Sequence, residues 1–514
     1  MTAAVLPAPQ PGTSPFAGAD ICRQAGLTLP PGTARPNFDD DLWDFTDVNG
    51  LPVSLTLAVR RFSFTQIADP RWRLVAKELI FAMLAPRHEA VADLPRAFRA
   101  PMHLATASGR LQEISRFLNW LAAQGIPALG EVCAHHCEAY LARRRYVLGE
   151  HGTVVGERSP AVRRGAAQAI IDLLNYGELF TADRPDPALR PWGGATASAI
   201  AEMPSGRAGN KTPPLSDDVL RPMLAAALYL TTVIGPHAVT LNNQVREALR
   251  AWGRSGEEAF PSPSHAPVAE ITRLLDRYRC ENSPLPMLPR HWVSQRLASG
   301  WRPDDPLLTV GLNTLARQAG INRFSRRWLD ELRGPIEETL SGVGVQEIFA
   351  RDGTLVDRAD GQGQVPWSPP LHQPQAIALA GIVRTAAATV IAAISGMRAS
   401  ELMELQIGCR QPAEELLPDM TRYRLAGKLI KGQPLGGTRD EWVVIEPAYQ
   451  AAGLAGQLHD TPADGDLLFG RIAFSVRYAW FREWVNGPCG QRLGLEPVPD
   501  YPVSLRALRR ILSA

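Results

Sequence analysis

The chain has few of the features that mark secreted, membrane-spanning or disulfide-stabilised proteins. Six cysteines among 514 residues are too sparse for a disulfide framework and are typical of reduced thiols. No signal peptide is recognisable. The longest apolar runs, near 223–235 and 385–397, are shorter than the ~20 residues that a membrane-spanning helix needs. We therefore expect a soluble, cytoplasmic protein.

A metal site is also not expected, although one motif invites it. The stretch "CAHHC" contains Cys133, His135, His136 and Cys137, and its two cysteines would share a helix face. A closed zinc site usually takes a second pair of ligands at matching spacing. The sequence offers no such pair, so the motif does not predict bound metal.

Net charge gives little information, because 54 basic residues nearly balance 52 acidic ones. The charge is unevenly distributed, however. Residues 20–47 are acidic, residues 143–164 hold six arginines against two glutamates, and residues 506–514 hold three arginines and no acid. Local basic patches of this kind are typical of phosphate binding, and also of solvated helix faces.

Composition shifts divide the chain into five segments. Residues 1–60 are rich in proline and aspartate and predict a loosely packed N-terminal arm. Residues 61–182 show helical periodicity and predict a small helical domain. The Pro/Gly/Ser-rich stretch 183–214 predicts a linker. Residues 215–370 begin a second domain and contain an insertion to which no role can be assigned, and residues 371–514 complete that domain.

The pattern predicts a mainly α-helical protein with one small β-hairpin. In the first domain, helices are expected over 108–126, 129–148 and 159–180, with Gly125 as a stop signal. In the second domain, two strand-like stretches, "TRYRLAGKLIKG" and "DEWVVIE", flank a Gly-containing turn and predict the hairpin. Helical patterns resume at "FSVRYAWFREWV" and "SLRALRRILSA".

The stretch "IAAISGMRASELMELQIGC" (391–409) is the least ordinary part of the sequence. An apolar, small-residue helix runs into Gly396, which allows a tight turn. Arg398 and Glu401 follow on a new helical face. Such a pair is often only a surface ion pair. At the end of a buried helix, however, a charge needs a partner or a function.

The motif "ISGMRASELMEL" resembles the first arginine box of the tyrosine recombinases, the phage-integrase family. The resemblance implies that Arg398 is the first catalytic arginine and that Glu401 orients its neighbours. In the family a catalytic lysine lies on a β-hairpin shortly after this box. Lys431 is favoured for that role because it lies nearest the turn, and Lys428 is the alternative.

The second family box has the pattern His-x-x-Arg on a helix. In "VSLRALRRILSA" Arg509 matches the arginine, and Arg506 stands where histidine is usual. Arginine cannot act as a base at neutral pH, but it can donate hydrogen bonds to a phosphate. The predicted helical domain likewise resembles the family's core-binding domain. The residues then expected to contact DNA are Arg143, Arg144, Arg145, Arg163, Arg164, Lys428 and Arg510.

The resemblance covers roughly 70–220 and 375–514 and implies a site-specific recombinase. In this family a tyrosine attacks a DNA phosphodiester without metal, ATP or other cofactor, while arginines stabilise the charged transition state and the lysine protonates the leaving oxygen. The partners implied are duplex DNA and further copies of the protein assembled on it.

The chain departs from the family at the nucleophile. The tyrosine should follow the second arginine box, but Tyr478 and Tyr501 both precede it. We therefore expect a recombinase whose catalytic domain is incomplete in this sequence. The alternatives are a catalytically inactive DNA-binding protein derived from a recombinase, and a helical interaction protein that binds no nucleic acid.

Overall fold

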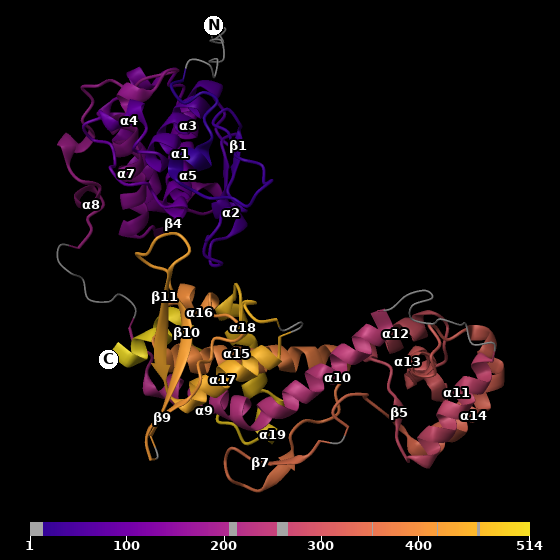
Figure 1. Cartoon of the computed structure of the whole chain (residues 1–514). Coiled ribbons are helices and arrows are strands. Elements are labelled where there is room, and N and C mark those ends of the chain that lie inside the picture. The colour runs from indigo at the N-terminus through magenta and orange to yellow at the C-terminus, as the bar shows by residue number, and fades with distance from the viewer. Residues whose placement is uncertain are drawn as a thin grey trace. The chain divides into compact units, whose positions relative to one another are not determined.

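The structure is a computed structural model that describes residues 14–204, 213–253, 266–351, 353–418, 420–459 and 463–513. Helices dominate, and the strands form small, mostly antiparallel sheets (Figure 1). This confirms the expected mainly α fold with a small sheet. The chain forms two compact units: Met1–Lys211 with the turn Gly432–Gly437, and Thr212–Lys431 with Thr438–Ala514. The boundary at Lys211 falls inside the predicted linker.

The first unit is a helical domain with two small hairpins. Its helices are α1 (Ile21–Ala25), α2 (Leu57–Arg60), α3 (Pro70–Leu84), α4 (Glu89–Ala92), α5 (Leu104–Ala123), α6 (Ala134–Arg145), α7 (Pro160–Asn175) and α8 (Ala197–Ile200). Its strands are β1 (Leu42–Asp44), β2 (Arg61–Ser63), β3 (Tyr146–Leu148) and β4 (Val154–Glu157). The three helices predicted from periodicity are confirmed as α5, α6 and α7. Gly125, at φ 76°, follows the end of α5 as expected.

The prediction that residues 1–60 form a loosely packed arm is wrong for residues 14–60, and residues 1–13 lie outside the described part of the chain. Phe16, Phe38 and Trp43 are fully buried in the core of the first unit. The rings of Phe16 and Phe81, on α3, lie 4.4 Å apart between centroids. Proline and aspartate suggested a loop, and the segment is indeed irregular, but its aromatic residues pack against α3 and make it part of the core.

The described part of the predicted linker also packs against the first unit. The Asp183 carboxylate accepts hydrogen bonds from the Trp72 indole (2.7 Å) and from the backbone N–H of Leu129 (2.9 Å). Ala197 and Ala201 of the short α8 region are buried. Residues 183–204 therefore belong to the helical domain.

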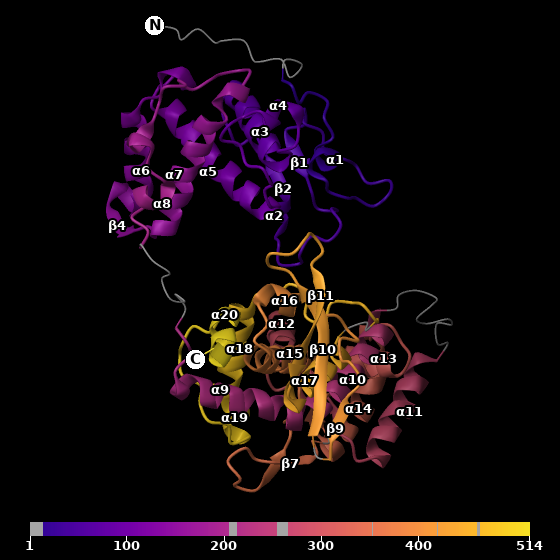
Figure 2. The same ribbon diagram turned by 60° about the vertical axis from the view of Figure 1, so that its left-hand side comes forward.

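The second unit is built around one long helix. Its main helices are α9 (Asp217–Tyr229), α10 (Gly235–Gly253), α11 (Pro267–Cys280), α12 (Arg290–Ala298), α13 (Leu312–Gln318), α14 (Leu329–Val343), α15 (Gln373–Ser395), α16 (Ala399–Met403), α17 (Glu446–Gln457), α18 (Phe474–Asn486), α19 (Pro488–Arg492) and α20 (Leu505–Arg509). Helix α15 runs through its middle, packed by α9, α10, α17, α18 and α20 (Figure 2).

Helix α15 is longer than the apolar run in its sequence suggested. Two stretches, Asp217–Arg250 and Gln373–Ser395, are long and apolar enough to cross a membrane by length and composition. In α15, Thr385 and Thr389 interrupt the apolar run, but each hydroxyl donates to a carbonyl four residues back (2.8 and 2.9 Å). In the apolar window of α15, 72% is buried inside the protein, which is typical of a core helix.

The predicted hairpin is confirmed and gains a third strand. Strands β10 (Met420–Leu429) and β11 (Thr438–Val444) pair antiparallel, with Lys428 directly opposite Arg439. Strand β9 (Glu414–Leu417) pairs with the other edge of β10. Two further short pairs are parallel β5 (Leu285–Pro286) with β6 (Val345–Gln346) and antiparallel β7 (Leu355–Asp357) with β8 (Gln364–Pro366).

The predicted insertion contributes to two cores. Helix α10 packs on α15 in the main core. Helices α11, α13 and α14 form a separate small core that includes Ile271, Leu315 and Ile336. Residues 267–343 are therefore a helical subdomain of the second unit (Figure 1).

Candidate functional site

The turn after α15 presents Arg398 and Glu401 as a tight pair. Gly396 ends α15 with φ 65°, a left-handed conformation that favours glycine. Arg398 is extended and serves as the N-cap of α16, so the expectation that it lies within a helix is wrong. The helix starts one residue later because Glu401, at its third position, accepts from the backbone N–H of Arg398 at 2.7 Å.

Glu401 is a buried carboxylate with both oxygens in use. Its side chain is 2% exposed, and Oε1 accepts from the Arg398 guanidinium at 2.7 Å. The Arg398 side chain is 37% exposed. The buried Glu401 carboxylate thus holds the half-exposed Arg398 guanidinium in a fixed position. In a solvated ion pair both partners can move, whereas here the carboxylate cannot.

The final helix brings a second arginine to this turn. Nε of Arg509 donates to the carbonyl oxygen of Gly396 at 2.9 Å. Leu505 and Leu508 of α20 are buried against α15, so Arg506 and Arg509 share the exposed face of the helix. Arg510 is half-buried just beyond it. The structure therefore places Arg398, Glu401 and Arg509 at one turn, with Arg506 beside Arg509 on the surface.

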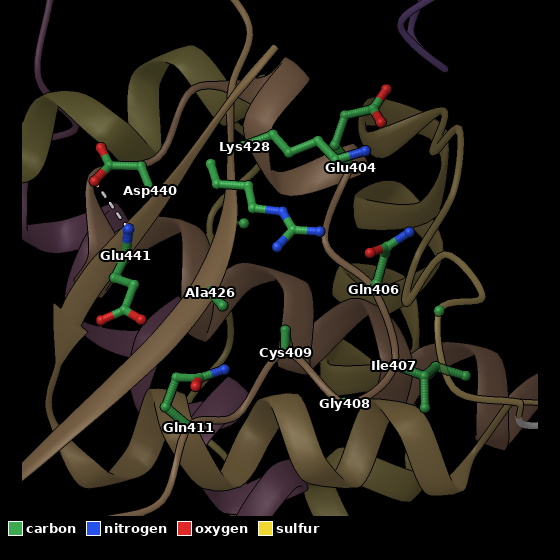
Figure 3. A pocket seen from close by; sticks show the side chains of 13 residues that line it. Glu404, Gln406, Ile407, Gly408, Cys409, Gln411, Ala426, Lys428, Asp440 and Glu441 are labelled. Carbon is green, nitrogen blue, oxygen red and sulfur yellow. Dashed lines mark hydrogen bonds between the residues drawn. The ribbon is translucent and has the colours of Figure 1, made fainter. Parts of the chain in front are cut away.

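A cleft of about 870 Å³ separates the hairpin from the segment that follows α16. Lys428 and Arg439 line it from β10 and β11, and Glu404 lines it from the other side. Figure 3 shows Lys428 extending across this cleft toward the segment that carries Glu404. Two cations directly opposite each other destabilise a hairpin unless something compensates their charge. Glu404, Asp440 and Glu441 also line the cleft, and their carboxylates supply compensating negative charge.

The two candidate lysines differ in their surroundings. Lys428 lines the cleft, whereas Lys431 follows the end of β10 and is exposed in the turn toward β11. Neither amino group forms an ion pair with a residue that the structure describes. The geometry favours Lys428 over Lys431 as the lysine that a bound ligand would meet.

Three of the five arginines expected to bind DNA in the first unit have acidic partners. Arg144 pairs with Glu113 at 2.8 Å, and Arg145 pairs with Glu157 at 2.8 Å. Arg163 is buried and also pairs with Glu157. Arg143 and Arg164 are exposed, and within the described part of the chain neither forms an ion pair. Glu113 lies outside residues 143–164, so the composition of that stretch overestimated its unpaired positive charge.

The two tyrosines considered from sequence differ in accessibility. Tyr478, on α18, is 3% exposed, and burial raises its pKa to about 12. Tyr501 is 39% exposed in the segment before α20. A hydroxyl that is buried with a raised pKa is a poor nucleophile, so Tyr478 is unsuited to attack a phosphodiester.

Sequence reasoning missed several residues around these sites. Arg439 could have been found from the hairpin register, which sets it opposite Lys428. Glu404 follows α16 and had no pattern to mark it. Arg384, Arg471 and Arg477 come from different segments and gather around one pocket, a grouping that no local pattern contains.

Comparison with known proteins found no relative of this chain. No protein-family model matches the chain, and neither a curated protein nor a solved structure matches it. The candidate site therefore rests on its own residues and their geometry.

Proposed function

We propose that this protein binds duplex DNA and holds a backbone phosphate at the turn formed by Arg398, Glu401 and Arg509, as a tyrosine-type site-specific recombinase does. In this proposal residues 61–182 act as the core-binding domain and residues 371–514 as the catalytic domain. The protein would work in the cytoplasm, on DNA, with further copies of itself and without a cofactor.

One observation carries the proposal. The two segments compared with the family's boxes, around Arg398 and around Arg509, meet at a single turn through the hydrogen bond to Gly396. Arg398 and Arg509 are both accessible enough to donate to a ligand, since the Arg398 side chain is 37% exposed and Arg509 lies on an exposed helix face. Guanidinium groups fixed in this way suit the non-bridging oxygens of a phosphate.

The residues suggest a division of roles. The two arginines would stabilise negative charge on the phosphate as it develops, an effect worth ~3 kcal/mol per donor at such sites. Glu401 would keep Arg398 oriented. Lys428, in the adjacent cleft, would protonate the leaving 5′-oxygen. The attacking group of the family is a tyrosine, and no tyrosine of this chain stands after the second arginine box.

The second candidate function is DNA binding without strand cleavage. It is favoured by the burial of Tyr478, which keeps that hydroxyl from reaching a phosphodiester. Under this alternative the arginines grip a phosphate but no covalent intermediate forms. Removing a nucleophile costs many orders of magnitude in rate even where the rest of a site survives.

A nicked suicide duplex tests both candidates at once. Gel-shift binding that weakens steeply with salt would support DNA binding, because phosphate contacts release counterions. We expect such binding without a covalent protein–DNA adduct for this 514-residue chain. A covalent adduct would support the active recombinase and refute the inactive alternative. Binding that is absent, or independent of salt, would refute both.

A further inference from the structure

A cavity of about 490 Å³ lies between α17 and the segment that follows α16. Residues 407–409 line both this cavity and the cleft described above, whereas Lys428 lines only the cleft. Most of its walls are apolar side chains or glycines, and Leu468, one of them, is buried. Cavities of ~300–1,000 Å³ with mostly apolar walls and a few polar groups are typical of small-molecule sites.

Arg410 is the only charged residue in this lining among those that the structure describes. It is exposed to solvent, but its guanidinium is held in place, because it lies over the ring of Tyr449, 4.9 Å from the ring centroid. The Tyr449 hydroxyl donates to the carbonyl of Gln411 at 2.9 Å, which fixes the ring. Arg410 forms no ion pair with any described residue. Its guanidinium is therefore oriented by stacking and keeps its donors for another acceptor.

Two glycines of α17 shape the cavity in different ways. A Cβ atom at Gly453 would lie 2.6 Å from the Arg410 guanidinium, so glycine is needed there to seat that side chain. A Cβ atom at Gly456 would lie 3.8 Å from Leu468 and 3.9 Å from Ile407, which are ordinary contacts. Neither glycine has a positive φ. Since glycine within a helix is less stable than alanine, Gly456 leaves open a space that a side chain could fill without a clash.

We propose that this cavity binds a small molecule with an apolar body and one carboxylate group. The apolar body would pack against the walls that include Leu468, and the carboxylate would accept from the Arg410 guanidinium. The planar fork of a guanidinium matches the two oxygens of a carboxylate. This inference does not depend on the proposed binding of DNA.

Octanoate is the probe, titrated into the full chain by isothermal titration calorimetry. Octanamide has the same apolar chain without the charge and should bind about tenfold more weakly, because the charged hydrogen bond is lost. Acetate has the charge without the apolar chain and should show no binding. Absence of octanoate binding to the wild type would overturn the proposal. Equal affinity for octanoate and octanamide would overturn the assignment of a carboxylate ligand.

Gly456→Leu tests whether the cavity is the place of binding. A leucine there would occupy the space beside Leu468 and should weaken octanoate binding at least tenfold. Its melting temperature should not fall, because leucine favours the helix and fills an apolar space. Gly342→Leu is the matched control, since Gly342 also lies in the last turn of a helix, α14, and has open space around it. Octanoate affinity of Gly456→Leu equal to that of the control would overturn the proposal.

Arg410→Gln tests the role of the guanidinium without changing the cavity walls. We expect it to bind octanoate and octanamide with similar affinity, so the tenfold preference of the wild type is lost. If Gly456→Leu melts below the wild type, Arg410→Gln alone decides. Loss of the preference for octanoate then supports the proposal, and a retained preference overturns it.

Discussion

The guanidinium Nε of Arg509 donates a hydrogen bond to the carbonyl oxygen of Gly396, 2.9 Å away, across 113 residues of sequence. This bond ties the last α-helix to the turn that presents Arg398. It satisfies a carbonyl at the end of α15, where the helix itself offers no further donor. The bond thereby joins the segment that carries Arg509 to the turn before Arg398.

Removal of the Glu401 carboxylate is expected to destabilise the second unit. Glu401→Ala leaves the Arg398 backbone N–H and guanidinium without their buried acceptor and should cost about 1–3 kcal/mol. Glu401→Gln keeps one acceptor oxygen and should cost less. Urea denaturation measures both, with the exposed Glu415→Ala as control. An unfolding midpoint for Glu401→Ala equal to that of the control would contradict the structural role of this carboxylate.

The variants Arg509→Ala and Arg506→Ala should differ in their free energy of unfolding, although both arginines lie on α20. Arg509→Ala removes the bond to Gly396 and should lower the free energy of unfolding by about 1 kcal/mol. Arg506→Ala removes an exposed side chain and should stay within about 0.5 kcal/mol of the wild type. Thermal denaturation distinguishes them. Equal losses for the two variants would show that the Gly396 bond does not contribute to stability.

The two hairpin lysines give a second matched pair, this time for DNA binding. Lys428→Ala should weaken duplex binding and reduce the log–log salt slope by about one, because the amino group lines the cleft beside the candidate site. Lys431→Ala should have the smaller effect, since Lys431 lies beyond the strand. Fluorescence anisotropy titrations at several salt concentrations provide the measurement. The opposite ranking would favour Lys431, the lysine preferred from sequence.

Asp172 should make the stability of the first unit depend on pH. Burial raises the pKa of this carboxyl from 3.8 to about 6, even though Arg110 lies 2.8 Å away and acts in the other direction. Between about pH 4 and pH 6 the folded protein therefore holds a proton that the unfolded chain has lost. This contribution to stability is present below pH 4 and disappears as the pH rises through 6.

The variant Asp172→Asn isolates that contribution. It lacks the titration, so the difference in unfolding free energy between wild type and variant should change across pH 4–6 and stay constant above pH 7. Urea denaturation at each pH gives this difference, with the exposed Asp304→Asn as control. A constant difference across the whole range would mean that Arg110 offsets the effect of burial and that the pKa is not raised.

Local patterns were predictable from sequence because they depend on neighbouring residues. The apolar period of α15, the Gly396 turn and the strand alternation of β10 and β11 are set by backbone hydrogen bonding and side-chain direction. The spacing of Arg398 and Glu401 also guarantees that they can meet, whichever way the helix cap is arranged.

Other predictions failed or stayed open because they depended on distant contacts. Residues 14–60 were predicted to be loosely packed, because their own sequence does not show that Phe16, Phe38 and Trp43 pack in one core with α3. The arginines of α6 and α7 were predicted to be available for DNA, whereas Arg144 pairs with Glu113 on another helix. The choice between Lys428 and Lys431 depended on where the hairpin ends and on what faces it.

By itself, therefore, the sequence determined a mainly helical chain, a hairpin and a guanidinium–carboxylate pair at the end of a buried helix. Only the tertiary structure decided that Arg509 joins that pair, and that Arg384, Arg471 and Arg477 share a pocket. The reason is physical. Helical and strand periods are local properties of the backbone, but the meeting of distant side chains follows from how α15 is packed by α18 and α20.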